Sequence, residues 1–214
     1  MQQIIERLKN QNALSEIIEK RLREFWKYCV EEIRDVAIRE SVELYLQKTA
    51  PWQFFSAPAS PSGKHHPIWQ NDPGGILRNT VECCLSIDML MTQEWQLGDA
   101  DGIPHEPARS IIYAATIVSD TCKGGNPWGP KTDRNHGRIA AELWKTAAGN
   151  LAIPQNAQEL IYEAVYWHLG RWTPGWTEEI DASLSLHTKI THALDALYAD
   201  KNLEKIFIPR PLPM

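Results

Sequence analysis

The stretch IIYAATIVSD, residues 111–120, decides the fold: it is an uncharged, mostly apolar run that ends in an aspartate. Together with the preceding PARS it predicts a buried helix over residues 107–119, too long and too apolar for a surface strand. A carboxylate directly behind such a helix costs several kcal/mol if it is buried without partners. Asp120 therefore needs a cation or several hydrogen-bond donors.

Helical periodicity continues on both sides of this stretch, where apolar residues recur at spacings of three and four. The pattern predicts helices over residues 13–48, 76–95, 136–149, 157–168 and 181–200. Asn12 is the expected N-cap of the first helix, Pro51 ends it, and its length predicts a bend or a division into two helices. No segment alternates polar and apolar residues as a strand would, so we predict an all-α fold.

A chain of 214 residues can bury one substantial core. We expect an N-terminal helical extension over 1–50, a helical domain over 51–200 and an irregular tail over 201–214. The extension is expected to pack onto the body, and a homodimer through a coiled coil of this helix is the alternative. Proline, glycine and serine break regular structure in the loops 51–75 and 123–135. The first loop is long enough to border a site.

Composition excludes several classes of protein. The net charge of −5 argues against a broad phosphate-binding surface for nucleic acid. The four cysteines form no CxxC pair, which favours reduced, buried, structural thiols. No apolar run reaches the roughly 18 residues of a membrane span. The N-terminus has no signal-peptide core, so we expect a cytoplasmic protein without membrane contact.

Four ionisable residues, each in a different predicted helix or at its end, stand out as candidate metal ligands: Asp120, His136, His168 and Asp195. Any one of these histidines taken alone is more often structural, but inward side chains on facing helices build metal sites in helical bundles. Mixed oxygen and imidazole ligands suit Mn, Fe, Mg or Zn. Lys123 lies on the helical face of Asp120. It either pairs with Asp120 or contacts an anionic substrate while Asp120 holds an ion.

The surroundings of these residues resemble segments of the HD-domain metal-dependent phosphohydrolase superfamily. The similar segments occur in the same order over about residues 54–200, and they are GGILRNTVECCLSID (74–88), ATIVSDTCK (115–123), NHGRIAAELW (135–144), AVYWHLGRW (164–172) and THALDAL (191–197). The run FFSAPASPSGKHHPIWQNDPGGILRNT (54–80) also resembles certain HD-domain nucleases and conjugation-related proteins. The resemblance implies an HD-like helical bundle.

The departures from the family pattern concern the metal ligands. The family has histidine where this chain has Asn79, and His-Asp where it has Ser119 and Asp120. Loss of imidazole weakens binding of Zn, Fe or Mn at those positions, although Mg could bind between Asp120 and Asp195. The ligands of a second ion in two-metal members, Asp120, His136 and His168, are present. One divalent ion is therefore expected rather than two, with a site that has lost its metal as the alternative.

The resemblance implies a metal-dependent phosphohydrolase that acts on a nucleotide or nucleic-acid phosphoester, with a small nucleotide or an oligonucleotide as partner. Asp120 and Lys123 are the expected catalytic residues. The expected substrate contacts are His65, His66, Arg78, Asn79, Arg171 and Trp172, with Lys64 and Trp176 as further candidates. One alternative is a catalytically inactive HD-fold module that binds a nucleotide or a protein partner. Another is a structural protein that self-associates through its N-terminal helix.

Overall fold

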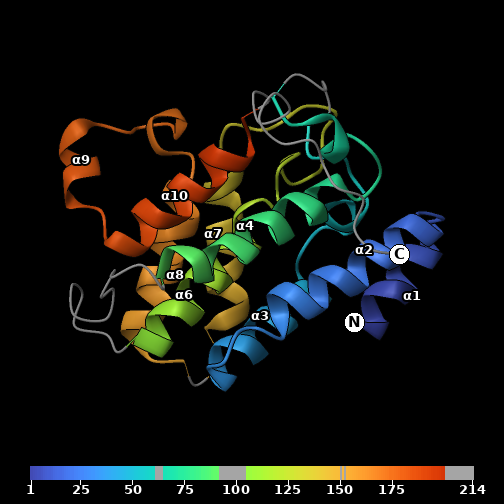
Figure 1. The fold of residues 1–214 in the computed structure, drawn as a ribbon, viewed down its shortest axis with the longest axis horizontal. Helices are drawn as coiled ribbons and strands as arrows, with labels where there is room; N and C mark the ends of the chain where they lie inside the picture. Colours follow the sequence, from blue (N-terminus) through green and yellow to red (C-terminus); the bar gives the residue numbers. More distant parts are fainter. Residues whose placement is uncertain (61–64, 92–104, 150, 152, 201–214) are drawn as a thin grey trace.

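The computed structural model describes residues 1–60, 65–91, 105–149, 151 and 153–200, and within them it is helical with no strand (Figure 1). The first half contains α1 (Gln2–Asn10), α2 (Glu16–Phe25), the π-turn η1 (Trp26–Val30), α3 (Val36–Lys48), the 3₁₀ turns η2 (Trp52–Phe55) and η3 (Ile68–Gln70), and α4 (Gly75–Met91). The second half contains α6 (His105–Ser119), α7 (His136–Ala148), α8 (Gln155–Trp167), the 3₁₀ turn η4 (Gly170–Trp172), α9 (Glu178–Ser183) and α10 (Leu186–Tyr198). The predicted all-α class is confirmed.

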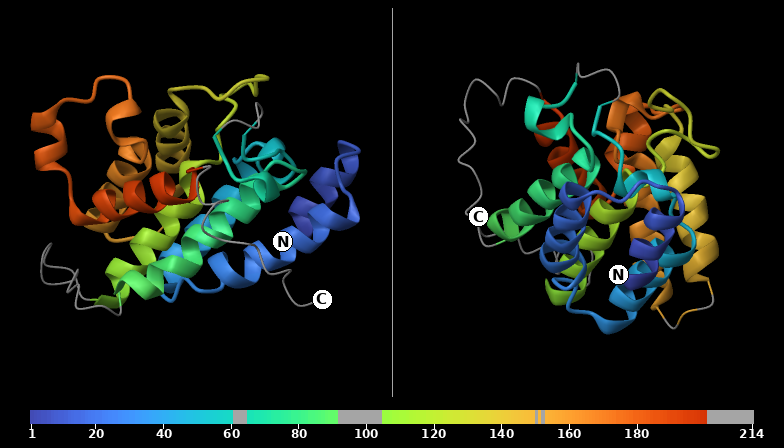
Figure 2. Two further views of the ribbon diagram at one scale, coloured as in Figure 1. Left: turned by 45° about the horizontal axis from the view of Figure 1, so that its top comes forward. Right: turned by 90° about the vertical axis from the view of Figure 1, so that its right-hand side faces the viewer.

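Helix α6, which contains the decisive stretch, is the centre of the packing. Residues 111, 112, 114, 115, 117 and 118 are fully buried. The helix packs against α3, α4, α7, α8 and α10, and Figure 2 shows it among them from two further sides. A helix surrounded in this way is apolar over most of its surface, which explains why residues 111–118 include no charged residue.

The N-terminal region differs from its prediction. Helix α1 was not predicted, whereas the expected division of the segment 13–48 is confirmed, since it contains α2, the π-turn and α3. Asn12 is not an N-cap: it lies in the turn after α1 with a φ of 52°. Ser15 caps α2 instead, because its hydroxyl accepts the N–H of Ile18.

Helix α1 is tied to α3 by Arg7. Its guanidinium donates to the carbonyl oxygens of Leu46, Gln47 and Ala50 at 3.1, 3.0 and 2.7 Å, near the end of α3 where helical carbonyls lack intrahelical partners. Leu8 is buried in the same hydrophobic core as residues of α6 and α8. Residues before and after position 50 therefore share one core. The division of the chain into an extension over 1–50 and a helical domain over 51–200 stays a prediction.

The C-terminal helical segment is also divided. Two helices, α9 and α10, occupy the region that was expected as one helix over 181–200. Helix α9 lies at the edge of the molecule and has no buried residue. Ser185 begins α10 by accepting the N–H of Thr188, and its own N–H donates to Glu163 of α8 at 2.9 Å. The predicted residues 92–95 and the tail 201–214 lie outside the described residues. None of the described helices combines the length and the apolar character required to cross a membrane.

Candidate metal centre

Three buried side chains from three different elements meet beside α6. Asp120 follows the last residue of α6, His136 is the first residue of α7, and His168 follows the last residue of α8. Gly137 permits the close approach of α7 to α8, since a Cβ there would lie 2.9 Å from the His168 ring and from the Val165 carbonyl oxygen. The buried cluster of Asp120, His136 and His168 could hold a metal ion.

The donor atoms of this cluster converge. Asp120 Oδ1 lies 3.2 Å from His136 Nε2 and 3.8 Å from His168 Nε2, and the two Nε2 atoms are 3.0 Å apart. All three atoms lie within 4.8 Å of one another. No hydrogen-bond donor among the described residues reaches Asp120 Oδ1. Three ligand atoms of these types at this spacing fit the inner coordination shell of a divalent ion.

The positions of the ring protons support this interpretation. His136 Nδ1 lies 2.6 Å from the Asp133 carbonyl oxygen, and His168 Nδ1 lies 2.8 Å from that of Val165. A carbonyl only accepts, so each Nδ1 must carry a proton, and a ring that is neutral with its proton there presents a lone pair at Nε2. Two lone pairs and a carboxylate oxygen then face one another. A cation relieves their repulsion, as an extra ring proton would.

Burial acts against the extra proton at His168. Its desolvated environment, followed by the neighbouring His136 ring, lowers the pKa of His168 from 6.5 to about 3. The ring is therefore neutral at physiological pH. A neutral imidazole whose Nδ1–H is anchored to the backbone is the usual form of a histidine metal ligand.

Asp120 divides its two oxygens between two partners. Burial would raise the pKa of its carboxyl, but the neighbouring ammonium of Lys123 holds that pKa well below 3.8. Lys123 Nζ donates to Oδ2 at 2.8 Å, while Oδ1 faces the two imidazoles. Pairing with Lys123 and facing a metal position, which the sequence presented as alternatives, are thus compatible.

A pocket of about 260 Å³, its open mouth included, adjoins the cluster on the side of Asp120. It is lined by Asn79, Thr80, Cys83, Thr116, Ser119, Asp120, Thr191 and Asp195. Asn79 Oδ1 and Thr116 Oγ1 are buried there without a hydrogen-bond partner among the described residues. Ser119 Oγ instead donates to the Ala115 carbonyl at 2.7 Å, as a helical serine commonly does.

Asp195 lines this pocket but is not one of the three converging residues. Burial, followed by the negative charge of Asp120, raises the pKa of Asp195 from 3.8 to about 6. The two carboxylates therefore face the same space and repel each other. Such a pair accommodates a cation or a shared proton.

The other residues that were predicted to contact substrate lie in different surroundings. His65 is exposed, whereas His66 is buried and contacts Lys123 Nζ through Nε2 at 3.3 Å. Arg78 is paired with Glu82 at 3.0 Å on the surface of α4. Arg171 stacks its guanidinium over Trp172, which is 59% exposed on η4 just after His168. Lys64 lies outside the described residues.

Sequence reasoning assigned no role to three residues that support the cluster, His192, Gly170 and Gln70. His192 donates from Nδ1 to the backbone oxygen of His168 at 2.7 Å, and Gly170 leaves space for that ring, which a Cβ would meet at 2.5 Å. Gln70 accepts at 2.8 Å from His66 Nδ1. The glycine in the sequence HLGRW was a usable signal, because its φ of 54° disfavours other residues. Gln70 carried no local signal.

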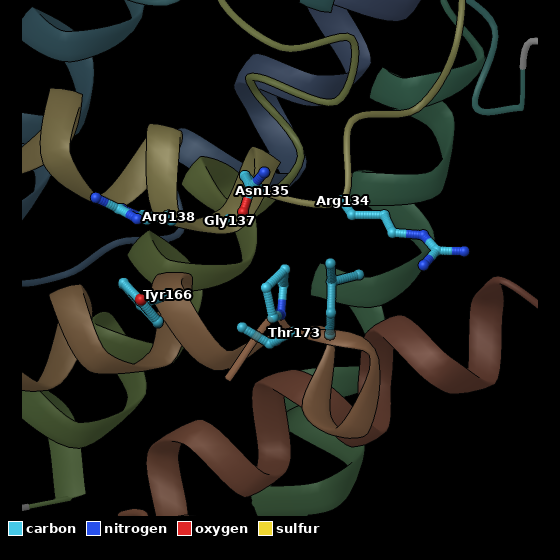
Figure 3. A pocket seen from close by; sticks show the side chains of 8 residues that line it. Arg134, Asn135, Gly137, Arg138, Tyr166 and Thr173 are labelled. Carbon is cyan, nitrogen blue, oxygen red and sulfur yellow. The ribbon is translucent and has the colours of Figure 1, made fainter. Parts of the chain in front are cut away.

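A second pocket, of about 290 Å³ with its open mouth included, is lined by residues that neighbour the two histidines in the chain (Figure 3). Asn135 and Gly137, which flank His136, and Leu169, which follows His168, contribute to its lining. Figure 3 shows Arg134 and Arg138 on opposite sides of it, with both side chains extending outward. The first pocket is thus lined by Asp120 of the cluster, and the second by chain neighbours of both histidines.

Comparisons of the chain with protein-family models, with curated proteins and with solved structures found no match.

Proposed function

We propose that the protein is a metal-dependent phosphohydrolase of HD type that binds one divalent ion through Asp120, His136 and His168. One observation carries the proposal: two imidazoles with backbone-anchored Nδ1–H groups and one ionised carboxylate direct two Nε2 atoms and Oδ1 at one another. Such an arrangement is unfavourable without a cation and favourable around one. The ordered resemblance to HD-domain segments supplies the reaction class.

The ligand types narrow the choice of ion. Two imidazole nitrogens and one carboxylate oxygen suit Mn, Fe or Zn better than Mg, which prefers oxygen ligands and retains its waters. The orphaned oxygens of Asn79 and Thr116, together with Asp195, would suit Mg in the adjoining pocket. A divalent ion supplies Lewis acidity and lowers the pKa of a coordinated water, which is the chemistry that phosphoester hydrolysis requires.

The other roles in the proposed reaction belong to side chains of the protein. Lys123 lies buried against Asp120, so its ammonium offsets the carboxylate charge at the floor of the site. Arg171 and Trp172 are exposed directly after His168, where a guanidinium attracts a phosphate and an indole face stacks on a base. We therefore propose a nucleotide or an oligonucleotide as substrate.

One observation favours a second candidate, a catalytically inactive module that binds a nucleotide or a protein partner. Ser119 and Asn79 stand where the resembling family has histidines, and the Ser119 hydroxyl donates to its own helix. A pocket with this reduced donor set can bind a ligand without turning it over. Stabilisation by nucleotides in the presence of a chelator, measured as an increase in Tm, would favour this candidate.

The metal content of the purified protein tests the first candidate. We expect about one equivalent of Mn, Fe or Zn in the wild type and a strong loss in His168→Gln and Asp120→Asn. His65→Gln is the matched control, because His65 is exposed and lies outside the cluster. Cleavage of nucleotide and dinucleotide phosphoesters with Mn²⁺, Mg²⁺ or Ni²⁺ should be lost together with the metal in His168→Gln and Asp120→Asn. No bound metal and no turnover over this panel would contradict the proposal.

A further inference from the structure

A buried chain of side chains leads from Asp120 to the surface of α4. Lys123 Nζ contacts Asp120 Oδ2 at 2.8 Å and His66 Nε2 at 3.3 Å. His66 Nδ1 contacts Gln70 Oε1 at 2.8 Å, and Gln70 Nε2 donates to Glu82 Oε2 at 2.6 Å. Lys123 and His66 are 7% and 3% exposed, so neither contact is replaced easily by water.

The hydrogen bonds that link these side chains all run in one direction, from Lys123 toward Glu82. Glu82 only accepts, so the amide nitrogen of Gln70 points to it and the amide oxygen points to His66. His66 must then carry its proton on Nδ1 and offer a lone pair at Nε2. Lys123 has only protons to give, and it donates one of them to that lone pair. Burial, followed by the charge of Lys123, lowers the pKa of His66 to about 4, so the ring stays a neutral acceptor.

The loop that carries His66 is anchored on α4 and on itself. Gln70 accepts the N–H of Ala59 at its backbone oxygen, and Asn71 donates to the backbone oxygen of His66. A Cβ at Gly75 would lie 1.8 Å from the Gln70 oxygen, so only glycine permits this approach at the start of α4. The segment 65–75 is thereby held in a fixed place beside Lys123.

The arrangement limits what Lys123 can do. A buried ammonium needs acceptors for its protons, and Asp120 Oδ2 and His66 Nε2 are the two that it contacts among the described residues. Without the imidazole, the ammonium would turn further onto the carboxylate. It would then compete for Oδ1, the oxygen that faces His136 and His168.

We infer that His66 is a positioning residue of the metal centre: as a neutral acceptor it holds the Lys123 ammonium on Asp120 Oδ2 and reserves Oδ1 for the ion. The first half of this inference, that His66 holds the Lys123 ammonium on Oδ2, concerns the metal-free protein. The second half, that Oδ1 is reserved for the ion, rests on the proposed function. His66 therefore acts through Lys123 and does not touch substrate.

Nitrogen NMR of the metal-free protein tests the first half. With ¹⁵N-labelled histidine, the signal that disappears in His66→Leu should belong to a neutral Nδ1–H tautomer at pH 7. Its Nε2 resonance should move in Lys123→Met, which removes the donor. A His66 ring with its proton on Nε2, or an Nε2 signal that does not respond to Lys123→Met, would overturn the inference without any reference to metal.

A double-mutant cycle on Zn²⁺ affinity tests the second half. His66→Leu should weaken Zn²⁺ binding about tenfold, the effect typical of outer-shell partners. In the Lys123→Met background the same substitution should change affinity less than about twofold, because residues that act through one another are not additive. His65→Leu, the same change at the exposed neighbour, should have no effect. Equal losses in both backgrounds would overturn the positioning role. A wild type that binds no Zn²⁺ or Mn²⁺ would overturn the proposed function, while the NMR result would still decide the hydrogen-bond chain.

Discussion

At the residue scale, both histidines of the cluster are oriented by the same local contact. Each ring donates from Nδ1 to the carbonyl three residues earlier, that of Asp133 for His136 and that of Val165 for His168. The Val165 carbonyl is near the end of α8, where carbonyls lack the next turn's N–H groups. A helix end thus supplies the acceptor that fixes the tautomer. Each ring is thus oriented by a contact within its own segment.

The substitution Gly137→Ala should disturb the placement of the His168 ring directly. The added Cβ would lie 2.9 Å from the His168 ring and from the Val165 oxygen, so one of the two helices must shift. We expect a loss of unfolding free energy of about 1–3 kcal/mol and a marked loss of metal affinity, measured by denaturation and by metal titration. Gly129→Ala is the control, because its Cβ would meet only ordinary contacts. Unchanged affinity in Gly137→Ala would argue against the helix approach as a requirement of the site.

The neutral ring of His66 predicts a pH dependence of stability. Its pKa is about 4 in the folded protein and about 6.5 when unfolded, so the unfolded chain binds the extra proton between these values. The stability from this group is present above pH 6.5 and is lost as the pH falls toward 4. Between pH 7.5 and 5 the loss amounts to at most about 2 kcal/mol.

Chemical denaturation at both pH values, with a chelator present, measures this loss. His66→Leu should unfold with a smaller difference between the two pH values than the wild type. Asp195 contributes with the opposite sign, because its pKa is raised to about 6, and it does so in both proteins. An identical pH dependence in wild type and variant would show that His66 does not titrate as the structure implies.

At the scale of elements, caps and tertiary contacts decide where the helices stop. Periodicity alone joins α9 and α10 into one helix. The break is at Leu184, whose extended backbone precedes the Ser185 cap, and Glu163 of α8 accepts from both Ser185 N and the Thr188 hydroxyl. This contact from another helix stabilises the start of α10. Helix α10 in turn carries His192, which supports the backbone of His168.

Ser185→Ala should therefore destabilise the protein by about 1 kcal/mol, the usual cost of a lost N-cap. Ser183→Ala provides the control two residues earlier, since its exposed hydroxyl donates only to the Ile180 carbonyl at the end of α9. Urea denaturation of the two variants beside the wild type measures the difference. Equal stability of the two variants would mean that the cap does not contribute.

At the scale of the whole molecule, one hydrophobic core connects the N-terminal helices to the metal centre. Leu8 of α1, Leu22 of α2 and Val42 of α3 belong to the same buried cluster as Ile112 of α6 and Val165 of α8. The apolar residues of α1–α3 are thus largely used within the chain. Dimerisation through this region, still a prediction, would have to use the exposed remainder, which includes Ile17 and Val36.

The substitution Leu8→Ala tests whether the N-terminal helices unfold together with the rest of the protein. Removing a fully buried leucine side chain should cost about 2–5 kcal/mol of unfolding free energy. Because the core is shared, circular dichroism and tryptophan fluorescence should report one transition, shifted as a whole. Two separate transitions, with only the first shifted, would instead support an N-terminal unit that folds by itself.

The sequence by itself determined the helical class, the central buried helix and the candidate ligands. These follow from short-range patterns: the apolar run before Asp120, the spacing of apolar residues, and histidines placed at predicted helix ends. Tertiary structure alone decided the rest, which depends on atoms far apart in the chain. It brought Asp120, His136 and His168 together, left Asp195 in the adjoining pocket and buried His66 against Lys123. Burial and the contacts between distant residues, such as that of His66 with Lys123, exist only once the helices have packed.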